Sequence, residues 1–318
     1  QALSSDRGEL DQLSMNESDK LIHKPVLLQE VLDLLDVKPD GTYLDATVGS
    51  GGHAYEIAKR LHTGLLIGID WDSEALECAR ERLEPFGDKV RLVQANFRDL
   101  EAVLDRLAIA QVDGLLFDLG LSSMLVDSPE RGFSFRSDGP LDMRMDREHN
   151  SLTAAEIVNS YRREELIRIL REYGEERWAP QIVNAIVAAR KREPLERTMQ
   201  LAQLVAGAIP APARRKMKIH PATRTFQALR IAVNDELENL RAGLEAGLRR
   251  LAPGGVVVVI SFHSLEDRIV KRFLRAKADY GEAEPSKLVR PAIGEITENP
   301  RARSAKLRAA WRATRKVF

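Results

Sequence analysis

The stretch LDATVGSGGHAYEI, residues 44 to 57, joins a strand pattern, a glycine turn and a helix pattern. Within it, Gly49, Gly51 and Ala54 fit the dinucleotide-binding spacing G-x-G-x-x-G/A. Such a turn holds a ligand at the start of a helix, along the carboxyl edge of a parallel sheet. The stretch therefore predicts a cofactor site and leaves open whether that cofactor carries a pyrophosphate.

Strand and helix patterns alternate outward from this turn. Strands are expected at 41–48, 64–70, 89–95, 112–120 and, after a long interruption, at the wholly apolar 255–262. This alternation predicts a parallel sheet with helices on both faces, and residues 306–318 are expected to return a last strand to it. Asp45, Asp70 and Asp118 each end a strand, so we expect them on one edge of the sheet.

The interruption begins after Asp118. Residues 119–150 are rich in Gly, Ser, Pro and Asp, and irregular segments of that length are usually functional. Four helix patterns follow, the first capped by Thr153 and Glu156, and one long helix is predicted from Thr225 towards Leu251. We expect a disordered extension at 1–20, a sheet domain formed by 21–125 and 222–318, and a loop with an all-helical insertion at 126–221.

The composition favours a cytosolic enzyme. Apolar residues make up 44% of the 318 and charged residues 30%, and the single Cys78 allows no internal disulfide. The sequence has no apolar run near the roughly 20 residues needed to span a membrane, and its polar, acidic start has no signal-peptide pattern. The net charge is zero, but 197–234 and 299–318 contain basic residues and no acids. These tracts either bind a polyanion through one face or form a solvated helix face and a flexible tail.

The charges around the turn favour a cationic cofactor. A carboxylate such as Asp45 beside a pyrophosphate would cost energy through like-charge repulsion. S-adenosylmethionine has no phosphate and carries a sulfonium and an ammonium, so Asp45 and Asp118 would attract it. Asp70 suits a ribose diol in either cofactor class. The residues thus favour S-adenosylmethionine over a nicotinamide cofactor, which stays an alternative.

Longer motifs carry a resemblance to a known family. These are HKPVLLQEVLDLL, DATVGSGGHA, DLGLSS, ERGFSFRSDGPLDMRMD, HPATRTFQALRIAVNDEL, ISFHSLEDRIVKRF and ENPRARSAKLR. Together, from about residue 23 to 312, they resemble the bacterial cytosine-N4 methyltransferases of 16S ribosomal RNA, the RsmH (MraW) family. The resemblance implies a Rossmann-like class I methyltransferase fold. It also implies methyl transfer from S-adenosylmethionine to the exocyclic amine of a decoding-centre cytidine, cytidine 1402, of 16S rRNA in the small ribosomal subunit.

The resemblance also implies a set of cofactor contacts. Carried over position by position, they fall on Gly51, Gly52, His53, Asp70, Phe97, Asp118 and Leu125. Leu125 departs from the family, which commonly has glutamine in a stretch S-S-P-Q. Because leucine lacks the amide, it offers only a backbone or apolar contact.

Catalytic candidates follow from the chemistry of the amine. The N4 lone pair is delocalised into the ring, so the enzyme must position the amine in line with the methyl group and accept its hydrogens. The aromatic N/D-P-P-Y/F motif of many amino methyltransferases is replaced here by Asp118-Leu119-Gly120. The candidates are Asp118, Ser122, Ser123 and His263. Alternatively, Asp118 serves only the cofactor, the serines only a turn, and His263 only caps a helix.

RNA recognition is assigned to the insertion and the basic tracts. Phosphate contacts are expected from Lys216, Lys218, His220, Arg224, Arg301 and Arg303. Phe133 and Phe135 either stack on an unpaired base or pack within the loop. A non-catalytic RNA-binding assembly factor and a methyltransferase acting on protein or DNA amines stay open as alternatives. No metal is expected, and a homodimer is compatible with the sequence.

Overall fold

Seven strands form one sheet in the order β3-β2-β1-β4-β5-β7-β6. The computed structural model describes residues 25–314, so the predicted disorder at 1–20 lies outside the described residues. The strands are β1 (Thr42–Asp45), β2 (Leu65–Asp70), β3 (Val90–Gln94), β4 (Val112–Asp118), β5 (Leu251–Ser261), β6 (Ala283–Pro285) and β7 (Lys306–Arg312). β1 to β5 are parallel, whereas β7 runs antiparallel to β5 and β6. The predicted Rossmann-like sheet is confirmed, and only the short edge strand β6 was not anticipated.

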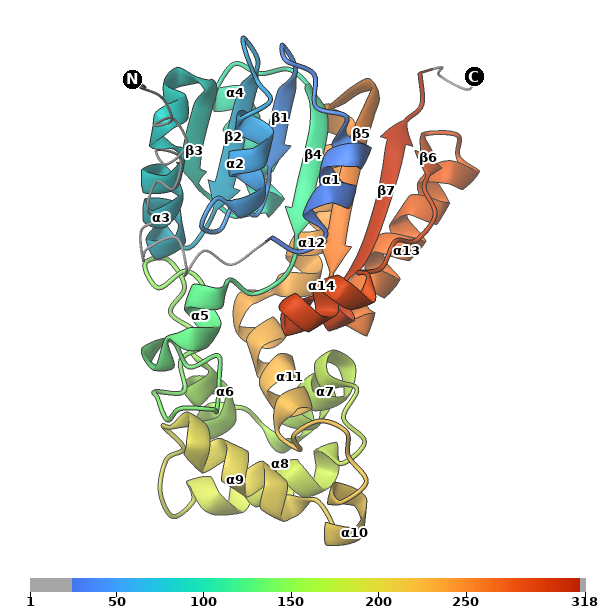
Figure 1. Ribbon diagram of the computed structural model, residues 1–318. Coiled ribbons are helices and arrows are strands. Elements are labelled where there is room, and N and C mark those ends of the chain that lie inside the picture. Colours follow the sequence, from blue (N-terminus) through green and yellow to red (C-terminus); the bar gives the residue numbers. More distant parts are fainter. Residues whose placement is uncertain (1–24, 315–318) are drawn as a thin grey trace, which may run out of the picture.

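Helices cover both faces of the sheet (Figure 1). One face packs against α1 (Leu28–Leu35), α2 (Gly52–Ala58) and α3 (Ser73–Leu83), and the other against α4 (Leu100–Arg106), α12 (Glu236–Arg250) and α13 (Ser264–Asp279). Strand β5 shows why it had to be wholly apolar. Its Val256 and Val258 enter the first layer, while Val257 and Val259 enter the second, so both sets of alternating side chains are buried.

The strand order reverses between β1 and β4. From β1 the chain adds β2 and β3 on one side and then returns to add β4 on the other. The two strands are paired with Asp45 opposite Leu116, and the loops that follow their carboxyl ends lead in opposite directions across the sheet. Ligands of open parallel sheets bind at such a reversal.

A separate helical part lies beyond the carboxyl ends of β4 and β5 (Figure 1). It contains α5 (Ser123–Asp127), α6 (Ala154–Ser160), α7 (Arg163–Gly174), α8 (Ala179–Arg190), α9 (Thr198–Ala208) and α10 (Ala211–Arg214). Its apolar core is distinct from the two layers around the sheet and includes Phe226, Leu229 and Val233, which lie beyond residue 221. The domain boundary drawn there stays a prediction, and the apolar packing of the helical part continues to Val233.

The long helix predicted from Thr225 towards Leu251 is wrong. The structure has two helices, α11 (Thr223–Asn234) and α12, separated by Asp235 with φ 49°. Both helices are amphipathic, so the spacing of apolar residues continues across the break. Aspartate is among the residues that adopt this left-handed conformation, which lets the chain turn from the helical part to the sheet.

The C-terminal region returns to the sheet through α14 (Ile293–Glu298) and β7. Near it, the backbone N–H of Leu27 donates a hydrogen bond to Glu295 at 2.7 Å. Within residues 25–314, none of the helices is both long and apolar enough to cross a membrane.

Candidate functional site at the carboxyl edge of the sheet

The glycine turn connects β1 to α2. Gly49 and Gly51 have φ of 51° and 81°, which favour glycine, and Gly51 is the residue that precedes the helix. The N–H of Gly49 donates to the Asp70 carboxylate at 2.8 Å, so the turn is anchored to the end of β2. The predicted strand–turn–helix is confirmed, and its backbone lies directly against one of the strand-end acids.

The start of the described chain packs on this turn. A Cβ atom on Gly52 would lie 2.8 Å from Pro25, so only glycine allows the segment to approach this closely. His53 is buried, and its Nε2 lies 3.0 Å from the carbonyl oxygen of Val26. On its other side, Nδ1 lies 3.5 Å from Asp118 Oδ2. His53 therefore connects the first described segment to the end of β4.

Three carboxylates meet where β1, β2 and β4 end. Asp45 is 1% exposed, and burial raises its pKa to about 7, with further contributions from Asp118 and Asp70. Burial also raises the pKa of Asp70 to about 6, although the N–H groups of Asp72 and Gly49 oppose this. The pKa of Asp118 is raised by burial too, and His53 partly opposes that rise. The edge thus concentrates negative charge at a cost that a cation would relieve.

Aromatic side chains border Asp70. Trp71 follows it directly and lies 6.4 Å, between ring centroids, from Phe97 after β3. Phe97 in turn packs edge-on against Phe117 at 5.6 Å. A Cβ on Gly243 of α12 would come within 2.8 Å of the Phe97 ring, so glycine makes room for it. Phe97 and Trp71 together offer ring surface beside the acid that suits a ribose.

The loop after Asp118 uses its residues for local structure. The Asp118 N–H donates to Thr47 Oγ1 at 2.6 Å, which ties β4 to the glycine turn. Ser122 caps α5, since its Oγ accepts the N–H of Leu125 at 3.2 Å, and Ser123 begins that helix. The Leu125 side chain is buried in the core of the helical part, so a contact with a cofactor falls to its backbone.

His263 caps the N-terminus of α13, which is the alternative to a catalytic role that the sequence had left open. Its Nδ1 accepts the N–H of Glu266 at 3.4 Å, and its Nε2 lies 3.1 Å from the Glu266 carboxylate. Glu266 is buried and accepts the N–H groups of Phe262 and His263. Glu236 approaches the same two side chains, but its carboxylate accepts hydrogen bonds from two nitrogens of the Arg230 guanidinium, Nε at 2.9 Å and Nη2 at 2.8 Å. An arginine thus already supplies the cation of this cluster.

A buried arginine joins the two parts of the molecule. Arg131, in the loop after α5, is 2% exposed and lies 3.2 Å from Asp72 and 3.0 Å from Glu74 of α3. Its other nitrogen donates to the carbonyl oxygens of Arg144 and Met145. Asp72 also donates its N–H to Asp70, so Arg131 is connected to Asp70 through one intervening residue.

Comparison with known proteins identifies the family. The family model described as the MraW methylase family matches residues 20–313. The chain belongs to the MraW methylase family. Three relatives named ribosomal RNA small subunit methyltransferase H are closely similar. The protein from Symbiobacterium thermophilum is 53% identical over 90% of this chain and 95% of its own. The protein from Geobacter sulfurreducens is 52% identical over 91% of this chain and 98% of its own. The protein from Halothermothrix orenii is 50% identical over 92% of this chain and 99% of its own.

This MraW methylase is an S-adenosylmethionine-dependent methyltransferase, as the resemblance implied. The alternatives of a nicotinamide enzyme and of a non-catalytic factor are set aside. The site fits the cofactor on its own evidence, because three strand-end carboxylates with raised pKa values favour a sulfonium and an ammonium. Asp118 Oδ1 is buried without a hydrogen-bond partner in the described residues, so the carboxyl edge of the sheet holds an unused acceptor.

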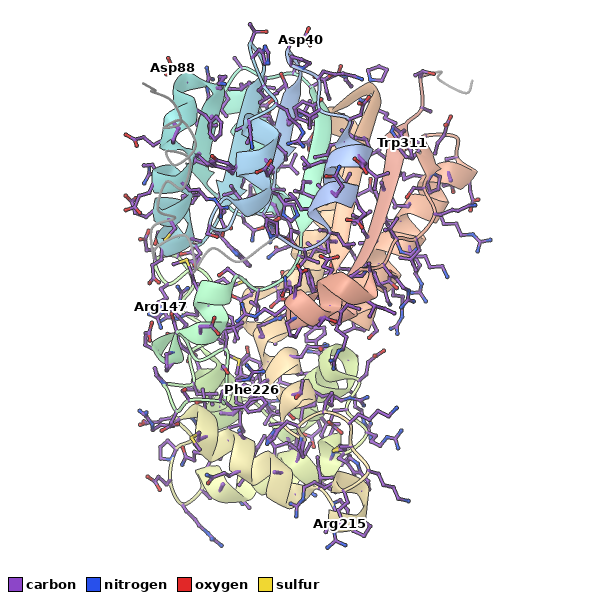
Figure 2. All side chains as sticks on the ribbon, in the orientation of Figure 1. Asp40, Asp88, Arg147, Arg215, Phe226 and Trp311 are labelled. Atoms are coloured by element: carbon purple, nitrogen blue, oxygen red, sulfur yellow. The ribbon has the colours of Figure 1, made fainter. Side chains whose placement is uncertain are left out.

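The basic residues of this MraW methylase divide into two groups. Arg301 pairs with Asp127 of α5 at 2.9 Å, Arg224 donates to the carbonyl of Glu175, and the His220 ring packs on Phe135. Lys216, Lys218 and Arg303 are exposed, and the neighbouring Arg215 lies at the far end of the helical part (Figure 2).

The two phenylalanines of the long loop pack within the protein. Phe133 is buried in the core of the helical part, and Phe135 packs 4.7 Å from Phe226. Local packing, one of the two readings of the sequence, therefore describes both rings.

Sequence reasoning missed Trp71 and Arg131. Trp71 directly follows Asp70 in the sequence, so its position in the chain was a usable signal. Arg131 had no such signal, because its partner Asp72 lies 59 residues away.

Proposed function

We propose that this protein transfers the methyl group of S-adenosylmethionine to the N4 amine of cytidine 1402 of 16S rRNA in the small ribosomal subunit. The observation that carries the proposal is the buried Asp118 Oδ1, which has no hydrogen-bond partner within residues 25–314 and lies at the strand reversal, at the acidic edge of the sheet. An acceptor in that place suits an amine that must be held and must lose a proton. The relatives' name, ribosomal RNA small subunit methyltransferase, supports the choice of RNA.

The cofactor would lie along the carboxyl edge of β1, β2 and β4. Asp70 would accept the ribose hydroxyls, Phe97 would pack on the adenine, and the backbone of Gly51, Gly52 and Leu125 would contact the remainder. His53 and Asp118 would flank the methionine end. When bound, the cofactor supplies a methyl group made electrophilic by the sulfonium. The chain's own residues bind it, align it and balance its charge.

The cytidine would have to leave its stack to reach this crevice. Asp118 Oδ1 would accept a hydrogen of N4 and fix the direction of its lone pair, which is the positioning that an amine with a delocalised lone pair requires. Ser122 Oγ already caps α5, and His263 already caps α13, so both would act at the walls of the crevice. Ser123 is retained as a candidate by its place at the start of α5.

The helical part and the exposed lysines would bind the RNA. Lys216 and Lys218 follow α10, at the end of the helical part farthest from the sheet in Figure 1. Contacts there would grip the RNA at a distance from the reacting base, and phosphate contacts position without reading sequence. A substrate of this size is compatible with a protein monomer or a homodimer acting in the cytoplasm, where ribosomes assemble.

The test is transfer of labelled methyl to small subunits purified from cells that lack the modification. We expect one methyl per subunit, recovered as N4-methylcytidine after nuclease digestion and mass spectrometry. The matched variant is Asp118→Asn, which keeps the size of the side chain and should lower the rate at least about 100-fold. Label in another nucleoside, or in protein, would contradict the proposed substrate.

A further inference from the structure

The two ring nitrogens of His53 have different partners. Nε2 lies 3.0 Å from the Val26 carbonyl oxygen, which can only accept, so Nε2 carries a proton. Nδ1 faces Asp118 Oδ2 at 3.5 Å. A neutral imidazole with its proton on Nε2 would therefore present a bare lone pair to a carboxylate. One additional proton between Nδ1 and Oδ2 turns that repulsion into attraction.

The surroundings of the His53–Asp118 pair are poorly solvated and acidic. His53 is 5% exposed, so water does little to screen the two groups. The charged groups near Asp118 are His53 from α2, Glu266 from α13 and Asp45 from β1. Two of these three are acids, so negative charge on Asp118 is costly. The 3.5 Å separation is long for a hydrogen bond, but catalytic contacts commonly shorten when substrate binds.

The two carboxylate oxygens of Asp118 differ in their surroundings, and the side chain as a whole is 25% exposed. Oδ1 is buried and has no hydrogen-bond partner within residues 25–314. Oδ2 faces His53, and the Asp118 N–H is held by Thr47. Asp118 is thus held at its backbone N–H, and His53 and the Gly120 N–H both act on its carboxylate. Oδ1 is left to accept a hydrogen bond once substrate binding uncovers it. In this arrangement Asp118 has the place of a base and His53 the place of the group that orients it.

We propose that Asp118 Oδ1 takes the proton released by the N4 amine, and that His53 is a positioning residue that acts through Asp118. This inference rests on the proposed function. The N4 lone pair forms the bond to the methyl carbon while the carbon–sulfur bond breaks and its electron pair stays on sulfur. The amine nitrogen, now positively charged, gives one proton to Oδ1. The pair returns to its single shared proton when one proton leaves to water.

The rate of methyl transfer should depend on the protonation of this pair. Oδ1 accepts only while Asp118 is a carboxylate, so the single-turnover rate should fall on the acid side with one inflection. Because burial raises the pKa of Asp118, that inflection should lie above the usual carboxyl range. The electrostatic influence of His53 opposes the rise. His53→Gln removes that influence, so it should move the inflection to higher pH.

The experiment measures single-turnover transfer to unmethylated small subunits from pH 5 to 9, with saturating S-adenosylmethionine. We expect His53→Gln to lower the rate about 10- to 100-fold and to shift the inflection upward. His62→Gln, an exposed histidine just after α2, is the matched control and should leave both unchanged. A cofactor contact alone would weaken cofactor binding yet keep the saturated rate. A His53→Gln rate within twofold of wild type, with an unmoved inflection, overturns the inference.

A spectroscopic measurement does not depend on the folding of the His53 variant. Nitrogen resonances of the full chain labelled with ¹⁵N-histidine should show a proton on His53 Nε2 and a second one bound at Nδ1. Asp118→Asn should convert Nδ1 to a bare nitrogen. Identical His53 resonances in the two proteins would overturn the shared proton. If wild-type protein makes no N4-methylcytidine at all, the proposed function fails, whereas a normal product with these contrary results removes only the inference.

Discussion

The sheet edge and the helical part treat their acids in opposite ways. At the edge, Asp45 is buried without a cationic partner among residues 25–314, and its pKa is raised to about 7. In the helical part, the Arg197 guanidinium hydrogen-bonds Asp138 and lowers its pKa. Paired charges hold a loop in place, whereas unpaired buried charges cost energy that folding must supply. The difference supports the proposal that the chemistry lies at the sheet edge and that the helical part binds and positions the substrate.

The largest effect is expected where the two regions meet. Arg131→Met would leave Asp72 buried without its cation, so the free energy of unfolding should fall by about 3–5 kcal/mol. Denaturant unfolding measures this, and Arg136→Met, exposed in the same loop, is the matched control. If Arg131→Met instead unfolded in two separate transitions, the helical part and the sheet would be independently stable, and the bridge would serve only their alignment.

The next effect tests the unpaired charge at the sheet edge. The pKa of Asp45 is raised above its unfolded value, so its favourable contribution is complete below about pH 4 and is lost as pH rises towards 7. Without cofactor, Asp45→Asn should therefore be more stable than wild type at pH 8, by up to about 4 kcal/mol. The exposed Asp40→Asn, at the opposite end of the sheet (Figure 2), is the control. A stability difference that does not change with pH would contradict the cost assigned to this carboxylate.

Patterns within a short segment predicted most of the sheet, and contacts between distant segments were beyond them. The strand-end acids were located correctly because each follows its own apolar run. The break at Asp235 was missed because two amphipathic helices happen to continue one spacing, and Arg131 was missed because its partner comes from another part of the chain. The role of His53 depends on Val26 and Asp118, which only the fold brings to its two nitrogens.

A smaller effect is expected at Asp70, the proposed acceptor of the ribose hydroxyls. Asp70→Asn removes the charge, and its single oxygen can keep the Gly49 N–H but not also the Asp72 N–H. S-adenosylmethionine affinity should fall about 10- to 100-fold, or about 1.4–2.7 kcal/mol, in calorimetric titration. Affinity for the small subunit should stay within threefold, because the proposal assigns that contact to the helical part. A comparable loss of RNA affinity would show that the two regions do not divide cofactor and substrate as proposed.

The smallest effect probes the helical part alone. Lys216→Ala combined with Lys218→Ala removes two exposed charges beyond α10. Small-subunit affinity should fall several-fold, and the slope of its logarithm against the logarithm of salt concentration should become shallower by about 1.4, because each single-strand phosphate contact contributes about 0.7. Cofactor affinity should not change. Lys59→Ala, exposed on the face of the sheet part, is the control. An unchanged salt slope in the double variant would place the RNA on another surface, because the loss of phosphate contacts reduces the number of counterions released and so must change the slope.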